Sequence, residues 1–311
     1  MRPALSVIFF TVLSGAGYGL WCLLGLALAT GLYPLAGVAV LVPLAFGCLL
    51  VTAGLLASTS HLGRPGRAWR ALSQWRSSWL SREGIAALLA YLPVPVLAWL
   101  AFPHRGGPVL RVAGAVLSLC ALATILCTAN IYRSLKTVAA WRLRQVLPLY
   151  FAFALLSGGL CLWTWLTLLP GQPRGNALPL TLLVLAVLTG VVKADYWRAV
   201  DALPAPTPGH ATGLAMLGQV RSFEGPVSET SYLTREMAFV LARKHAARLR
   251  RIALVLFAIL PAWGIATEWL FDAAWIVPVA AVAVIAGLFI ERWLFFAEAR
   301  HAVAAFFPQR A

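Results

Sequence analysis

The residues best suited to proton chemistry lie in one polar connection between two strongly apolar segments. The stretch SHLGRPGRAWRALSQWRSSWLSRE contains His61 near its start, Glu83 at its end, and Arg64 and Arg67 between them. An imidazole titrates at about pH 6.5, a carboxylate can pass a proton on, and an arginine can hold negative charge. Residues 59–82 are therefore a candidate site for a ligand that exchanges protons.

Each of these residues also has a simpler interpretation. His61 is equally consistent with an interfacial histidine that reaches water. Glu83 is equally consistent with an acid placed favourably at the start of a helix, with Ser81 as a candidate N-cap. From Gly66 to Leu80, tryptophans recur at helical spacing among arginines, which is typical of a short helix lying at a membrane surface. For these tryptophans a belt that anchors the chain is favoured over a ligand role.

The elements that position these residues follow from composition. The 311 residues are 61% hydrophobic and only 11% charged, with a mean hydropathy of +0.84. Such a chain cannot present a wettable globular surface, so the fold class is an all-α membrane protein. We predict a single membrane domain over 1–311, with no soluble domain at either end and a first helix that is a true span rather than a cleaved signal. The eight predicted spans are 4–30, 35–58, 84–103, 109–132, 147–169, 177–197, 251–271 and 274–296.

The net charge of +15 could indicate a nucleic-acid partner, but the distribution of the basic residues argues against it. Of the 25 lysines and arginines, 22 lie at the termini, in the three large connections or at the helix ends beside them. The other three are Arg105, Arg111 and Arg174. The positive-inside rule then places both termini and the large basic loops in the cytoplasm.

Cofactors held within the chain are not indicated. The five cysteines lie in apolar runs without the clustered spacing of an iron–sulfur or zinc site. No histidine falls at the depth that haem ligation requires. We therefore predict no haem, no metal and no iron–sulfur cluster in this chain. Four charged residues fall near the predicted cytoplasmic helix ends and one near the opposite end, which disfavours an ion pump: Lys193, Asp195, Glu291, Arg292 and Glu268.

A lipid-soluble quinone is the ligand that the 59–82 connection fits best. Interconversion of a quinone and its quinol moves two electrons and two protons, so its pocket must hydrogen-bond the ring oxygens and exchange protons with water. His61, Arg67 and Glu83 supply these functions at the membrane surface. A transporter and a purely structural tether are the alternatives from other classes, and neither requires this combination of residues.

Three segments resemble the membrane-anchor subunit of dimethyl sulfoxide reductase. The stretch from Ser60 to Glu83 carries the family's histidine, H-L-G-x-P-x-R-A turn and S-x-E in order. The segment TANIYRSLKTVAAW is similar to its tyrosine-containing segment, and FIERWLFFAEA is similar to its arginine-aromatic closing motif. The first motif is fairly specific, the other two are weak alone, and the resemblance extends over the whole chain.

The resemblance implies an eight-helix anchor in the inner membrane of a bacterium, bound to a molybdopterin catalytic subunit and a four-cluster iron–sulfur subunit. It implies that His61 binds quinol, with Arg67 and Glu83 beside it. Arg64 fills a position that is not fixed as basic in the family. Tyr132 and Lys136 are secondary candidates on the same side of the membrane. Either ubiquinone or menaquinone is compatible with these residues.

The charge distribution departs from the family's usual orientation, in which this loop faces outside. A sister group, the anchors of cytoplasmic sulfite-oxidising molybdoenzymes, is similar in sequence and has its catalytic subunits inside the cell. We therefore favour a sulfite dehydrogenase, with electrons passing from sulfite to quinone. The alternative is an anchor that oxidises quinol for an S- or N-oxide reductase.

The other large polar segment is the basic connection over 198–250. Its part from Thr207 to Gly225 is rich in glycine and proline, and Ser228 is a candidate helix start. The basic pattern that follows could continue without interruption into the seventh span. A basic cap on the bundle would explain the charge. The segment is longer than a simple connection requires, however, and we expect it to dock the iron–sulfur subunit.

Overall fold

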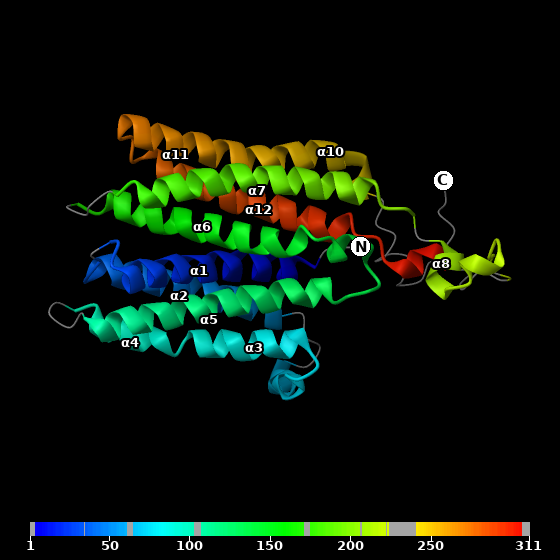
Figure 1. The fold of residues 1–311 in the computed structure, drawn as a ribbon, viewed down its shortest axis with the longest axis horizontal. Coiled ribbons are helices and arrows are strands. Elements are labelled where there is room, and N and C mark those ends of the chain that lie inside the picture. The colour runs from blue at the N-terminus through cyan, green and yellow to red at the C-terminus, as the bar shows by residue number, and fades with distance from the viewer. Residues whose placement is uncertain are drawn as a thin grey trace.

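The computed structural model of the chain is a bundle of long helices that run roughly side by side (Figure 1). It describes residues 4–33, 35–60, 65–102, 107–170, 175–205, 207–221, 223 and 241–306. Within these residues there is no strand, and eight helical segments are long and apolar enough to cross a membrane. They are Leu5–Thr30, Val38–Thr59, Trp79–Leu100, Pro108–Arg133, Val146–Leu168, Ala177–Asp201, His245–Phe271 and Ile276–Ala297. The prediction of eight spans is confirmed.

Six of these segments are single helices and two are interrupted. The single ones are α1 (Leu5–Thr30), α2 (Val38–Thr59), α5 (Pro108–Arg133), α6 (Val146–Leu168), α7 (Ala177–Asp201) and α12 (Ile276–Ala297). The third span consists of α3 (Trp79–Ala90) and α4 (Pro93–Leu100). The seventh consists of α10 (Leu241–Leu254), a π-helical turn over Val255–Ile259, and α11 (Leu260–Phe271).

The interruptions lie where proline would block a regular helix. Proline has no amide hydrogen and its ring clashes with the carbonyl four residues earlier. Pro93 follows the break between α3 and α4, and Pro261 is the second residue after the π-helical turn, which accommodates it. Pro43, in contrast, lies inside the continuous helix α2. The basic segment of α10 continues into the seventh span, as the sequence predicts.

Helix α1 lies at the centre of the bundle and packs against α2, α5 and α6 (Figure 1). Its contact with α6 brings the two backbones together. A Cβ atom at Gly19 would collide with the main chain of Ala154, and one at Gly158 would collide with the main chain of Gly19 and Leu20. Small residues at a helix crossing permit this close approach within a membrane, where dispersion contacts rather than the hydrophobic effect hold helices together.

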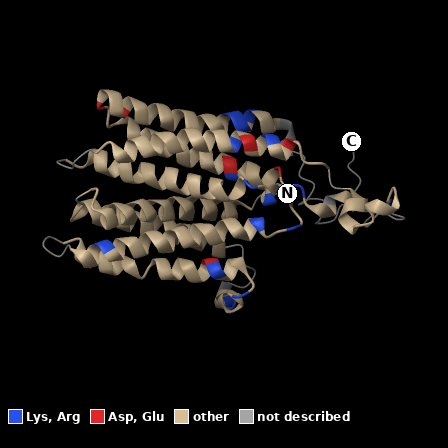
Figure 2. Ribbon diagram, viewed as in Figure 1, with Lys and Arg blue, Asp and Glu red and all other residues tan. Residues whose placement is uncertain are grey.

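Both termini and the long connections lie at one end of the bundle (Figure 1). Most lysines and arginines of the described residues gather at that end (Figure 2). Arg111, in the first turn of α5, is an exception at the other end. A short helix α8 (Pro208–Thr212), capped by the Thr207 side chain, and a 3-10 turn over Ala215–Leu217 extend beyond the bundle where the termini lie. The connection from 207 onward is therefore partly helical. The candidate helix start at Ser228 lies outside the described residues.

Two details of the 59–82 connection differ from expectation. The short interfacial helix is a 3-10 helix over Pro65–Gln74 rather than a helix that continues to Leu80. Helix α3 begins at Trp79, and its N-cap is Ser78, whose side chain accepts a hydrogen bond from the Ser81 amide. The predictions of a start at 84 and of Ser81 as the N-cap are wrong. Ser81 instead donates a hydrogen bond to the Ala71 carbonyl, which ties the 3-10 helix to α3.

The close contact of α1 and α6 predicts a position-dependent cost of adding a methyl group. Gly19→Ala should lower the free energy of unfolding by about 1–3 kcal/mol, the usual cost of overpacking, because the new methyl meets backbone that cannot move aside. Gly15→Ala in the same helix is the matched control, since a Cβ there meets nothing within 4 Å. Thermal unfolding of the two variants in detergent measures the difference. Equal stability would contradict a backbone contact at this crossing.

Candidate functional site

The predicted site residues divide into three groups. His61 and Arg64 lie outside the described residues. Two are exposed, namely Arg67 on the 3-10 helix and Lys136 in the connection after α5. Two are buried, namely Glu83 in α3 and Tyr132 near the end of α5. Glu83 is therefore the ionisable residue around which the described part of the site can be built.

Glu83 is 5% exposed and lies in the second turn of α3. Its carboxylate accepts a hydrogen bond from the Thr128 hydroxyl of α5. The same hydroxyl lies 3.0 Å from the carbonyl oxygen of Thr124. One hydroxyl hydrogen cannot serve both acceptors. Thr128 can donate to ionised Glu83, or accept from protonated Glu83 while it donates to Thr124. Both protonation states of Glu83 are thus accommodated.

The surface connection is fixed close to this carboxylate. Arg82, the residue before Glu83, donates hydrogen bonds to the carbonyls of Trp75 at 2.9 Å and Arg76 at 2.7 Å. Gly84, the residue after Glu83, leaves room for Leu72, because a Cβ at position 84 would lie 2.7 Å from the leucine side chain. The 3-10 helix therefore packs on the first turns of α3. Trp75 remains 52% exposed, as an anchor in a membrane surface would be.

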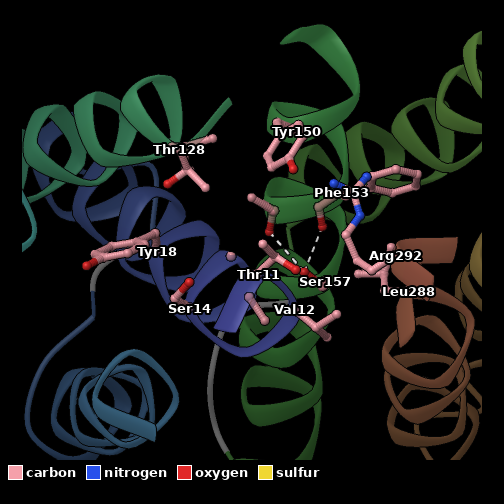
Figure 3. Close-up of a pocket in the computed structure, with 14 residues that line it drawn as sticks. Thr11, Val12, Ser14, Tyr18, Thr128, Tyr150, Phe153, Ser157, Leu288 and Arg292 are labelled. Carbon is pink, nitrogen blue, oxygen red and sulfur yellow. Dashed lines mark hydrogen bonds between the residues drawn. The ribbon is translucent and has the colours of Figure 1, made fainter. Parts of the chain in front are cut away.

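A small cavity of about 30 Å³ lies between α1, α5, α6 and α12 (Figure 3). Thr128 is part of its wall on one side and Arg292 on the other, so the partner of Glu83 and a guanidinium face the same space. Further polar groups come from Thr11, Ser14, Tyr18, Tyr150 and Ser157. The hydroxyl of Tyr18 is buried and has no hydrogen-bond partner among the described residues.

Arg292 belongs to a buried ionic cluster that joins α7 and α12. The carboxylate of Glu291 pairs with the Lys193 ammonium through one oxygen and with the Arg292 guanidinium through the other. Glu291 and Lys193 are fully buried, and Arg292 is 4% exposed. Aromatic rings surround them: the ammonium lies 4.0 Å from the ring centre of Tyr196, and the guanidinium 4.5 Å from that of Tyr150.

This cluster is not among the sites predicted from the sequence. In the sequence its three charged residues stand out as lying near helix ends, and two of them also belong to the arginine-aromatic motif, but none of them is a predicted site residue. A signal is present all the same, because charged residues within a span normally face the bundle interior and pair with one another. The segment FIERWLFFAEA carries Glu291 and Arg292 side by side. Their pairing with Lys193, about 100 residues away in the chain, depends on how α7 and α12 pack.

Tyr132 lies in an aromatic cluster next to these charges. Its ring stacks on Tyr150 with centres 5.8 Å apart, and contacts Trp141, Phe295 and Phe296. Trp141 donates a hydrogen bond to the Phe295 carbonyl at 3.2 Å, which fixes the segment after α5 against α12. This gives Tyr132 a clear packing role between the cavity and the end of the bundle.

Lys136 lines a different and larger hollow, of about 550 Å³, at the end of the bundle where the termini lie. Arg250 crosses it, with both terminal nitrogens on Asp201, at 2.7 and 2.9 Å, and its Nε 2.9 Å from Glu298. Burial raises the pKa of Glu298 above its ordinary value, and Arg250 opposes this shift. The hollow therefore combines basic and acidic groups from α7, α10 and the segment after α12.

The remaining candidate groups do not form a further site. The five cysteines are unpaired and lie buried or half-buried within the helices, as predicted. Across the described ranges, no group of three or more histidine, cysteine, aspartate and glutamate side chains is arranged to hold a metal. Glu268, near the opposite end of the bundle, accepts a hydrogen bond from Trp163 at 3.3 Å.

Comparison with known proteins agrees with this architecture. The profile of the DMSO reductase anchor subunit family matches residues 1–297. The chain is similar to the C subunit of the sulfite dehydrogenase of Allochromatium vinosum, with 34% identity over 326 aligned residues that cover 97% of each chain. A match of this length includes all eight spans and the Glu83 region. The chain therefore belongs to the DMSO reductase anchor subunit family, as the membrane anchor of a molybdenum oxidoreductase complex.

Proposed function

We propose that this anchor binds quinone at the end of the bundle that carries the 59–82 connection. It passes electrons between a [4Fe-4S] cluster of the iron–sulfur subunit and the quinone pool. The observation that carries the proposal is the buried Glu83 carboxylate, hydrogen-bonded by Thr128 and close to the 3-10 helix Pro65–Gln74. In the sequence, the connection that contains this helix carries Arg67 and His61. A transporter or a simple tether gives no reason for this arrangement.

The chemistry assigned to each residue follows from its protonation. A bound quinone would supply the two-electron, two-proton chemistry, and the protein must deliver or remove the protons. Glu83 holds or releases one proton, because Thr128 can hydrogen-bond it in either state. His61 is assigned to the second ring oxygen as donor or acceptor, and Arg67 to stabilising negative charge. Arg64, Tyr132 and Lys136 are secondary candidates, and Tyr132 acts through packing rather than contact.

We assign the complex as a sulfite dehydrogenase with its catalytic subunits in the cytoplasm. The similarity to the C subunit of a sulfite dehydrogenase supports this substrate, and the basic residues at the end that carries the termini support this orientation. Electrons then run from sulfite through molybdenum and the clusters to ubiquinone or menaquinone. A quinol-oxidising anchor of an S- or N-oxide reductase remains the alternative, supported by the family match.

Loss of the buried carboxylate should affect quinone reduction by the complex but not its dye-linked sulfite oxidation. We expect Glu83→Gln, and likewise His61→Ala, to lower sulfite-dependent quinone reduction by about 10²–10⁴-fold, the usual contribution of a positioned acid or base. Sulfite oxidation with an artificial dye should remain, because the dye takes electrons before they reach this chain. Glu268→Gln, a buried glutamate near the other end of the bundle, is the control. Undiminished quinone reduction in Glu83→Gln and His61→Ala would refute the assignment.

The basic connection should contribute to partner binding. Deleting residues 207–225 removes the short helices beyond the bundle, and we expect the yield of iron–sulfur subunit recovered with the purified anchor to fall at least several-fold. The deletion leaves the spans unchanged, so the membrane level of the anchor itself is the control. Full recovery of the partner would show that docking does not use this segment.

The proposed geometry also predicts how turnover affects the membrane. The quinone site and the iron–sulfur partner share one face, so protons are taken up and released on that face. Turnover in sealed vesicles should therefore build no membrane potential by itself, as measured with a potential-sensitive dye. A stable potential that an uncoupler abolishes would contradict a single-sided reaction.

A further inference from the structure

We propose that the cavity between α1, α5, α6 and α12 holds water that carries protons between Glu83 and the buried cluster of Lys193, Glu291 and Arg292. Lys193 is the group that gives and takes back the proton. This inference rests on the proposed function, because it supplies the protons that quinone chemistry at Glu83 consumes.

The cavity has the size and the lining that water requires. A buried water needs roughly 10–15 Å³ and two to four polar partners. The volume of about 30 Å³ accommodates about two, and residues that carry hydroxyl groups line it on three helices (Figure 3). Tyr150 is the most informative of them, because its buried hydroxyl has no hydrogen-bond partner among the described side chains and points toward the middle of the cavity (Figure 3). Water in the cavity would satisfy it.

The two ends of the cavity are suited to proton transfer. At one end Thr128 contacts both Glu83 and the Thr124 carbonyl, so its hydroxyl can reverse direction when Glu83 gains or loses a proton. At the other end Arg292 faces the cavity and pairs with Glu291. An arginine keeps its charge, so it orients water but releases no proton. Glu291 bridges to Lys193, which can release one.

Charge balance identifies Lys193 as the exchanging group. With all three residues ionised, the cluster carries one net positive charge in a buried region, where an unbalanced ion is strongly unfavourable. Ionised Glu83 across the cavity balances that charge. When Glu83 is protonated, the balance is restored if Lys193 becomes neutral, leaving the Glu291 and Arg292 pair intact. Moving one proton between Glu83 and Lys193 therefore keeps the buried region neutral in both states.

The cluster also has a connection to solvent. Glu298 caps the end of α12, about two helical turns after Glu291, and it pairs with Arg250. Arg250 pairs in turn with Asp201, whose side chain is 62% exposed. Glu298, Arg250 and Asp201 all line the large hollow at the end of the bundle. The water of this hollow is assigned as the source of the protons that reach Lys193, on the same face on which the partner subunit is proposed to dock, while Arg250 keeps its own proton and only holds Glu298 and Asp201 in place.

Two substitutions test the route in the assembled complex. Gly15 lines the cavity and a Cβ there meets nothing within 4 Å, so Gly15→Leu fills the space with little clash near its backbone. Lys193→Met removes the exchangeable proton and leaves the neutral pair of Glu291 and Arg292. Ala123→Leu, on the exposed side of α5, adds similar bulk as the control.

We expect both variants to lower quinone reduction at saturating quinone at least tenfold, with an unchanged KM for quinone and unchanged dye-linked sulfite oxidation. Proton delivery should become limiting, so the kinetic solvent isotope effect should exceed that of the wild type. Acetate, whose protonated form crosses membranes, should restore part of the rate. Ala123→Leu should match the wild type in every measurement.

Wild-type rates in both variants would overturn the route, and so would a slower rate with neither a larger isotope effect nor acetate rescue, which indicates disturbed packing. If either variant fails to assemble, Tyr150→Phe removes one hydroxyl from the cavity without adding volume and should show the same isotope effect and rescue. The outcome for the quinone site is separate. If Glu83→Gln is inactive while the route variants are normal, only the route is wrong; an active Glu83→Gln complex refutes the quinone site itself.

Discussion

Buried charges near one end of the bundle have to pair with one another, and this pairing constrains the helices around them. An unpaired ion inside a membrane protein is expensive, and removing one partner of a buried pair leaves that cost uncompensated. Glu291 joins the ammonium of Lys193 on α7 to the guanidinium of Arg292 on α12, and aromatic rings from α6, α7 and α12 enclose them. The relative positions of these three helices are thereby constrained where the chemistry is proposed.

The bundle relates this cluster to Glu83 through α1. Glycines on α1 and α6 let the two backbones meet, so the helices that carry Glu83 and those that carry the cluster share one compact interior. Where α1 instead presents Gly15, the space is not filled, and the cavity forms with Thr128 on one side and Arg292 on the other. Close packing and local under-packing along the same helix thus have different consequences. One holds the two halves of the bundle together, and the other leaves room for water.

Hydrophobic runs alone are sufficient to predict the eight spans, because a backbone in lipid has to satisfy its own hydrogen bonds and long apolar helices are the available solution. Finer features escape prediction. Ser81 is the N-cap expected from the sequence, yet Ser78 fills that position and Ser81 ties the interfacial segment to α3. Glu83 is expected at a helix opening, yet it is buried one turn inside. Local propensity ranks candidate caps, but the contact with Ala71 decides between them.

The class of the protein, the number of spans, the grouping of basic residues and the segment that carries His61, Arg67 and Glu83 can all be inferred without a structure. Composition and local motifs encode these directly. The folded bundle, in contrast, is needed to show that Glu83 pairs with Thr128, that Lys193 pairs with Glu291, and that a cavity lies between the two sites. These pairings join residues far apart in the chain, on helices whose surfaces are apolar nearly all round. The way the helices pack decides which polar side chains meet inside the bundle, and no local sequence pattern predicts this packing.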